Sequence, residues 1–286
     1  MTAGLAAIAP AAHAVSACRV NNTVVTGTMI SGTGGDDVIL CGSVEADTTV
    51  NGGGGNDQIT VVSHVAGFLY GGAGEDAIRV DGNTFEQELT GPTTVTGTIR
   101  GGAPVLGTLA DGKDVIDISG AYGTKNGGDA VTGTVAGDAG ADKITVTGGN
   151  AAAGQAGVPG QGVDGSGSVQ GGGGADEITV NGGYRDTFGS YRGPAVGSGE
   201  VRGGGPLGVL LDGDDTITLD SDIVSGTVNG DAGEDNISVQ TNGGEVRGST
   251  GDDRLEVTFR NDGVVDGGLG SDLCVIEAGN PPQNCE

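Results

Sequence analysis

The chain has 286 residues, of which 63 are glycine, four tyrosine, four phenylalanine and none tryptophan, so large side chains cannot fill an ordinary globular core. Acidic residues outnumber basic ones by 38 to 12, for a formal net charge of -26. This balance excludes nucleic acids and anionic membrane surfaces as natural partners, because both are polyanions, and it favours cations. No apolar run approaches the roughly 20 residues of a membrane-spanning helix, so we expect no membrane span.

The first segment has the composition of a targeting sequence. Residues 1–17 are apolar and rich in small side chains, and Ala12-His13-Ala14 has the small-x-small form that signal peptidase reads. A basic segment is missing, since the first positive charge is Arg19. We interpret residues 1–14 as a signal-peptide remnant, which predicts a secreted, extracellular protein whose folded domain spans 15–286. A disordered alanine-rich tail is the alternative.

Four cysteines form two terminal pairs, Cys18 with Cys41 and Cys274 with Cys285. Four cysteines permit three connectivities, and the local pairing is favoured. Export makes disulfides plausible because the extracellular space is oxidising, and such disulfides would cap both ends of the domain. The alternative is that Cys41 and Cys274 are small buried apolar residues.

A repeat occupies most of the chain. The segments GGGGNDQITV (52–61), GGAGEDAIRV (71–80) and GGGGADEITV (171–180) align without a gap, and uninterrupted copies recur every 18 to 20 residues. That period is typical of one coil of a solenoid. Alignment on the aspartate gives ten copies, at Asp37, Asp57, Asp76, Asp114, Asp142, Asp176, Asp215, Asp235, Asp253 and Asp272.

Apolar residues alternate with polar ones on both sides of each glycine turn, and a period of two predicts strands. Two columns follow the aspartates, running from Ile39 to Cys274 and from Cys41 to Ile276. A third column, from Ile30 to Val265, precedes the turns in the form G-x-V-x-G. We therefore expect an all-β fold with a single domain, a right-handed parallel β-solenoid of about ten coils with two short strands each. A flexible glycine-rich linker is disfavoured, because disorder would not keep three columns in register.

The glycine-aspartate turn leads into a strand, whereas phosphate-binding glycine loops open onto a helix. Glycines allow backbone carbonyls to point into the turn, and each aspartate adds one anionic oxygen. Oxygen ligands suit Ca²⁺ better than Zn²⁺ or Cu²⁺, and only His13 and His64 could offer imidazole.

The pattern G-G-x-G-x-D-x-U-x resembles the haemolysin-type, or RTX, calcium-binding repeat, and the resemblance covers residues 27–276. It implies that turn carbonyls and the ten aspartate carboxylates hold Ca²⁺ between successive turns along one edge. Inserts split the turns that begin at Gly101 and Gly203, so sites at Asp114 and Asp215 are expected to be the weakest. Alternatively, each aspartate caps its own turn without metal. Ten stacked carboxylates would, however, repel one another without a counterion.

Four connections in the central coils are longer than the rest, near 81–97, 119–133, 147–167 and 181–199. They should lie on the edge opposite the calcium turns, and they hold five of the eight aromatic residues. Insertions on one face of a solenoid often form its binding face, here for a protein or glycan partner. Tolerated variation in surface turns is the alternative.

These observations predict a secreted calcium-binding repeat protein that folds on binding calcium and serves as an extracellular structural, interaction or adhesion module. We expect no enzyme activity, since no catalytic set is evident. One alternative is an ice- or surface-binding solenoid. Its outward column would be Thr60, Thr145, Thr179, Thr218 and Ser238, interrupted by Arg79, Asp117 and Glu256. The other is a polysaccharide-acting β-helix enzyme, which would need two acids flanking a cleft at the inserted loops.

Overall fold

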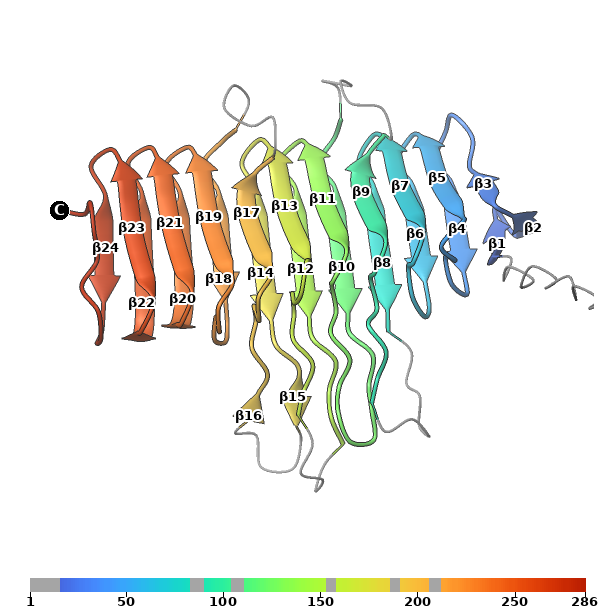
Figure 1. Ribbon diagram of the computed structural model, residues 1–286. Helices are drawn as coiled ribbons and strands as arrows, with labels where there is room; N and C mark the ends of the chain where they lie inside the picture. Colours follow the sequence, from blue (N-terminus) through green and yellow to red (C-terminus); the bar gives the residue numbers. More distant parts are fainter. Residues whose placement is uncertain (1–15, 83–89, 104–110, 153–157, 186–190, 206–211) are drawn as a thin grey trace, which may run out of the picture.

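The computed structural model describes residues 16–82, 90–103, 111–152, 158–185, 191–205 and 212–286. The expected remnant at 1–14, parts of three of the four long connections and most of both turn inserts lie outside the described residues. Within the described ranges the chain is all-β, with strands stacked into two long sheets and no helix (Figure 1). The predicted all-β, solenoid-like architecture is confirmed at this level.

The first sheet has twelve strands. For most of the chain, successive strands belong alternately to this sheet and to the second one. In spatial order they are β2 (Thr23–Gly27), β1 (Ser16–Val20), β4 (Val38–Cys41), β6 (Gln58–Val61), β8 (Ala77–Asp81), β10 (Val115–Ser119), β12 (Lys143–Thr147), β14 (Glu177–Asn181), β18 (Thr216–Leu219), β20 (Asn236–Asn242), β22 (Arg254–Asn261) and β24 (Leu273–Ile276).

The second sheet has ten strands, and a separate two-stranded sheet pairs β15 (Tyr184–Arg185) with β16 (Tyr191–Arg192). The ten strands are β23 (Val264–Leu269), β21 (Glu245–Thr250), β19 (Thr227–Ala232), β17 (Glu200–Gly204), β13 (Ser168–Gly173), β11 (Thr134–Ala139), β9 (Thr98–Gly102), β7 (Phe68–Ala73), β5 (Thr49–Gly54) and β3 (Met29–Ser31). Neighbours in both long sheets are parallel, apart from the two antiparallel pairs that β1 makes with β2 and β4.

The core lies between the two sheets and consists of aliphatic columns. Parallel pairing places equivalent residues side by side, for example Ile144 beside Ile178 and Val135 beside Val169. The three predicted columns are buried, except at the last unit, where Cys274 and Ile276 are only partly buried against the core. Each fully buried aliphatic side chain contributes roughly 1.5–3 kcal/mol, so the columns supply the main cohesion of the stack.

A fourth buried column lies at the end of each unit opposite the glycine turn, and the sequence analysis missed it. Isolated parallel bridges join its members from one unit to the next, and buried asparagines continue it. The column comprises Val44, Val65, Val95, Val131, Val163, Val196, Ile223, Asn242 and Asn261.

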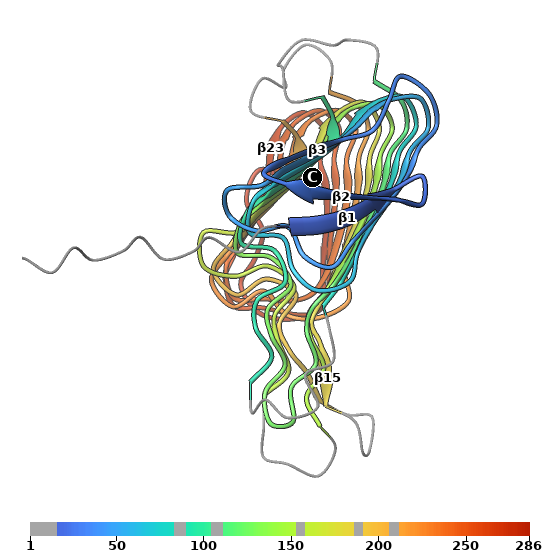
Figure 2. The ribbon, with the colours of Figure 1, turned by 90° about the vertical axis from the view of Figure 1, so that its right-hand side faces the viewer.

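Both ends of the stack carry a disulfide, as predicted. Cys18 in β1 is bonded to Cys41 in β4, and β1 with β2 lies across the first end (Figure 2). Cys274 in β24 is bonded to Cys285 in the terminal segment. That segment also pairs with β23, since the Gln283 N–H donates to the Val265 carbonyl at 2.9 Å. The antiparallel strand and the terminal segment satisfy backbone groups that open ends would expose.

The described parts of the long connections form one projection, which we call the extension (residues 90–92, 120–130, 148–151, 158–162, 182–185 and 191–194). It projects below β8 to β17, at the edge opposite the glycine-aspartate turns (Figures 1 and 2). Chain segments that leave the first sheet form one layer, and those that return form another.

Glycine backbones join the two layers of the extension. Hydrogen bonds of 2.8 Å run from Gly149 N to Gly128 O, from Gly160 N to Gly149 O and from Gly183 N to Gly160 O. Within one layer, Gly148 N donates to Asn181 O at 2.9 Å. A Cβ atom at Gly149 would overlap the Ala121 carbonyl oxygen, so only glycine permits this approach. The described parts of these connections are therefore packed structure.

Candidate metal centre

The ten predicted aspartates form one column, which we call the aspartate column (Asp37, Asp57, Asp76, Asp114, Asp142, Asp176, Asp215, Asp235, Asp253 and Asp272). Each follows a glycine turn and directly precedes a strand of the twelve-stranded sheet. All ten side chains are at most 2 % exposed. Carboxyl groups are rarely this buried unless they are paired, so the column calls for a physical explanation.

In nine of the ten aspartates, all but Asp37, the carboxylate oxygen Oδ1 links neighbouring units. The Asp57 N–H donates to Oδ1 of Asp76 at 2.8 Å, and the Asp76 N–H donates to Oδ1 of Asp114 at 2.7 Å. The same bond, of 2.7–2.9 Å, recurs between every consecutive pair from Asp37 to Asp272. The expected alternative, in which each aspartate caps its own turn, is therefore wrong for Oδ1, which accepts from the preceding unit instead. Only Asp37 also caps its own turn, through Thr33 N–H at 2.5 Å.

The second oxygen, Oδ2, has no hydrogen-bond partner at the other nine positions, although it is buried at each of them. It lies against the first glycine of its own turn, where a Cβ atom would overlap it, as at Gly52 beside Asp57. The carbonyl oxygen of the next unit's first glycine approaches the same point, for instance Gly71 O beside Gly52. The aspartate Oδ2 and a glycine carbonyl oxygen thus lie close together, at a point that any side chain larger than that of glycine would fill.

Burial raises the pKa of these carboxyl groups, because a buried charge loses its hydration. The pKa of Asp57 is raised. At seven other positions the raised pKa has a value. The pKa is about 6 at Asp76, Asp142 and Asp253 and about 7 at Asp235. The pKa is about 8 at Asp176 and about 9 at Asp114 and Asp215. At Asp37 the Thr33 N–H lowers the pKa instead. At pH 7 the carboxyl groups of Asp114, Asp176 and Asp215 therefore favour a bound proton or a bound cation over a bare charge.

The donor set is compatible with Ca²⁺ because it consists of carboxylate and carbonyl oxygens. Across the described residues, no three His, Cys, Asp or Glu side chains stand close enough to hold a metal ion by themselves. A cation in a glycine-aspartate turn would therefore take most of its ligands from the main chain. This agrees with the sequence interpretation, in which each turn supplies one carboxylate and several carbonyls.

The split turns keep the geometry of the uninterrupted ones. Gly101 and Gly203 adjoin Oδ2 of Asp114 and Asp215, and the next unit's glycine carbonyl approaches in both cases. Most of each insert lies outside the described residues, so the expectation that the inserts weaken the sites at Asp114 and Asp215 stays a prediction.

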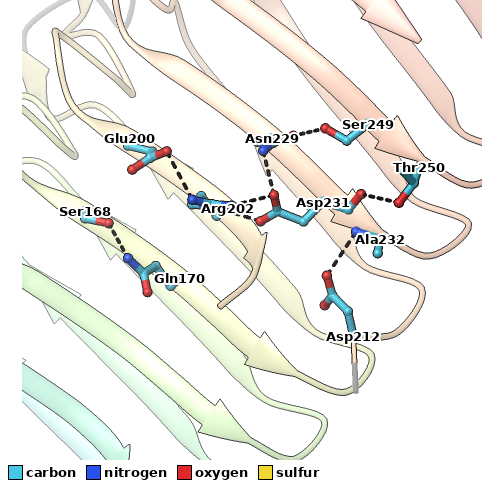
Figure 3. Close-up of polar contacts among 10 residues, drawn as sticks. All are labelled: Ser168, Gln170, Glu200, Arg202, Asp212, Asn229, Asp231, Ala232, Ser249 and Thr250. Atoms are coloured by element: carbon cyan, nitrogen blue, oxygen red, sulfur yellow. Dashed lines mark hydrogen bonds and ion pairs between the residues drawn. The ribbon is translucent and has the colours of Figure 1, made fainter. Parts of the chain in front are cut away.

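Sequence reasoning missed a polar cluster beside each split turn. Arg100 donates to both carboxylate oxygens of Asp138 at 2.9 Å through Nε, and Asp111 lies beside this pair. The same arrangement, an arginine bound to one aspartate with a second aspartate beside the pair, occurs about one hundred residues later in Arg202, Asp231 and Asp212 (Figure 3). The signal was present, because both split turns have the form R-G-G before the insert and D-G-x-D after it.

The threonine column expected on the outer face is present in part. Thr145, Thr179, Thr218 and Ser238 stand side by side on β12, β14, β18 and β20. Arg79 and Asp117 separate Thr60 from them and form an ion pair at 3.2 Å.

Comparisons with protein-family models, curated proteins and solved structures found no match to this chain. No helix in the described ranges is long and apolar enough to cross a membrane. Inferences about function therefore rest on the geometry of the turns.

Proposed function

We propose that this protein is a secreted, calcium-dependent repeat protein of the haemolysin type, in which Ca²⁺ bound along the aspartate column couples folding to the external calcium concentration. In this proposal the stack is a right-handed solenoid of about ten coils, and the protein is an extracellular structural, interaction or adhesion module rather than an enzyme. The extension would carry the protein or glycan partner.

One observation carries the proposal: nine buried carboxylate oxygens have no hydrogen-bond partner, and at seven of these positions a glycine carbonyl of the next unit approaches the same turn glycine. Leaving such groups unpaired costs free energy at every unit, and a shared cation would offset that cost. The formal charge of -26 favours cation binding, and the two disulfides suit an oxidising compartment.

A calcium titration followed by circular dichroism tests the proposal. The calcium-free chain at pH 7.5 should have little β structure and gain it on addition of Ca²⁺, because metal binding then supplies free energy of folding. A β-rich spectrum that excess chelator leaves unchanged would contradict it.

Asp76→Asn sharpens the test, because asparagine keeps the Oδ1 acceptor for Asp57 N–H but loses the charge. The calcium midpoint should rise several-fold, since a charged ligand is lost. Glu75→Gln is the matched control: it makes the same charge change on the neighbouring exposed side chain and should leave the midpoint unchanged. Equal midpoints in the two variants would favour protons over calcium in the column.

An ice- or surface-binding role is the second candidate, supported by the aligned run from Thr145 to Ser238. Thermal hysteresis measured with calcium present would distinguish it.

A further inference from the structure

The polar clusters at the two split turns contain more negative charge than their arginines neutralise. The first comprises Asp111, Asp114, Asp138 and Arg100, and the second comprises Asp212, Asp215, Asp231 and Arg202. Each cluster thus holds three carboxylates and one guanidinium, for a formal charge of -2. A divalent cation matches that charge.

The arginine binds only one carboxylate of its cluster. Arg202 donates to Asp231 through Nε at 2.8 Å and Nη2 at 2.6 Å, a bidentate pair of the strong type (Figure 3). Asp231 adopts a φ of +78° and Asp138 a φ of +83°, at a turn position that glycine occupies in several other units. Ser249 has a similar φ of +88° at the equivalent position, so this conformation belongs to the turn, and it is the aspartate side chain that adds the contact with arginine.

The carboxylate that follows each insert keeps a buried oxygen without a partner. Asp111 accepts from Gly112 N–H through Oδ1 at 3.1 Å, and its Oδ2 is unpaired. Asp212 accepts from Ala232 N–H through Oδ2 at 3.0 Å, and its Oδ1 is unpaired (Figure 3).

A second buried oxygen is directed into the same turn. Asp114 is 0 % exposed and Asp215 is 1 % exposed, and Oδ2 of each has no partner. Oδ2 of Asp114 lies against Gly101, and Oδ2 of Asp111 lies against the next residue, Gly102. At the second split turn, Oδ2 of Asp215 lies against Gly203, and Oδ2 of Asp212, which accepts from Ala232 N–H, lies against Gly204.

The position of these acids distinguishes the split turns from the other eight. Three residues before the column aspartate, the uninterrupted turns carry glycine, alanine, threonine or leucine, whereas the split turns carry Asp111 and Asp212. The insert and the additional carboxylate therefore occur together in both copies.

We propose that each split turn is a two-carboxylate Ca²⁺ site, in which Asp111 joins Asp114 and Asp212 joins Asp215, and that these two sites bind calcium more tightly than the uninterrupted turns. The inference reverses the expectation that the inserts weaken these sites. It rests on the proposed function for the identity of the ion.

The second site should be the tighter of the two. Asp214 stands where the first split turn has the exposed Lys113, and Glu200 also approaches Arg202, at 3.8 Å. The sequence of the second split turn therefore carries more formal negative charge than that of the first.

Terbium luminescence and isothermal calcium titration of the intact chain test the inference. The double variant Asp111→Asn/Asp212→Asn should lose the two tightest ions while its circular dichroism in saturating calcium stays unchanged, because asparagine can still accept from Gly112 and Ala232. The matched control, Glu75→Gln/Glu234→Gln, removes the same charge from exposed turn side chains and should retain both ions.

The outcomes separate this inference from the proposed function. If the wild-type chain binds calcium and the double variant binds the same number of ions with the same affinities, the inference is wrong and the proposed function stands. If the wild-type chain binds no calcium, both are wrong. Should the double variant fail to fold, the single variants decide: each should lose one tight ion, Asp212→Asn the tighter one, and an unchanged count in both would overturn the inference.

Discussion

At the glycine-aspartate edge, neighbouring units are joined through carboxyl side chains, whereas across the extension they are joined through hydrogen bonds between glycine backbones. The first edge changes its charge state with pH and cations, because the pKa values of its carboxyl groups lie between about 6 and about 9 at seven positions. The second edge has hydrogen bonds such as Gly149 N to Gly128 O, which carry no titratable group. The extension contains one carboxyl group with a pKa raised by burial, Asp129, which accepts from Gln161 N–H at 2.8 Å, so pH should act far more strongly on the aspartate column than on the extension.

The largest expected effect that separates the edges is the pH dependence of the calcium-free chain. A carboxyl group whose pKa is raised on folding binds its proton more tightly in the folded state, so stability is gained as pH falls from about 9 towards the ordinary value of 3.8, and is lost as pH rises. The calcium-stripped chain should therefore regain β structure at pH 5 and lose it at pH 8. Circular dichroism and urea unfolding at both values would measure this.

With calcium saturating, this pH dependence should be much weaker, because the cation replaces the proton. A calcium-free stability that is flat between pH 5 and pH 8 would show that the aspartate column does not control folding.

A smaller effect is expected from Gly149→Ala in the extension. The added Cβ atom would overlap the Ala121 carbonyl oxygen and meet Gly128 N and O at 2.7 Å, so the layers must separate at a cost of about 3 kcal/mol. Urea unfolding in saturating calcium would measure the loss, which should be the same at pH 6 and pH 8. The matched control is Gly42→Ala, where a Cβ atom meets nothing within 4 Å. Equal stabilities of the two variants would mean that the extension contributes nothing to cohesion.

The smallest of the three effects concerns a single link of the aspartate column. Asp76→Ala removes the acceptor for Asp57 N–H and should cost about 2 kcal/mol, because a buried donor is left unpaired. Asp76→Asn keeps the acceptor and should cost much less. Both should be measured by urea unfolding of the calcium-free chain at pH 5, where protonation has removed most of the charge. Similar losses in both variants would assign the effect to charge rather than to the hydrogen bond.

Much of the stack could be predicted from the sequence because strands repeat their pattern every two residues. Ile144, Ile178 and the other residues of the two columns that follow the aspartates keep a constant sequence separation from them, and eight of the ten aspartates keep a constant separation from the first glycine of their turn. The column that begins with Val44 and Val65 escaped prediction, since its spacing to the following strand varies between units. The extension escaped because its contacts are between backbones, and a glycine-rich segment looks the same whether it is packed or not.

The clusters at the split turns were hidden for a different reason. Asp138 and Asp231 occupy turn positions that elsewhere carry glycine, and nothing in their local sequence indicates a left-handed backbone. Asp111 and Asp212 are separated from their glycines by the inserts. Only the stacking of units brings Arg100 to Asp138 and Arg202 to Asp231, so these contacts required the three-dimensional structure.

The bonds that join the aspartate column all point the same way. In every link from Asp37 to Asp272, the N–H belongs to the earlier unit and the accepting oxygen to the later one. A chain emerges amino-terminus first from a ribosome or an export channel. The aspartate N–H of the last unit to have emerged therefore has no acceptor until the next unit follows. Each completed unit becomes fully bonded only when its successor arrives. Growth of the stack is thus a polar process, in which the terminal segment closed by Cys274 and Cys285 arrives last.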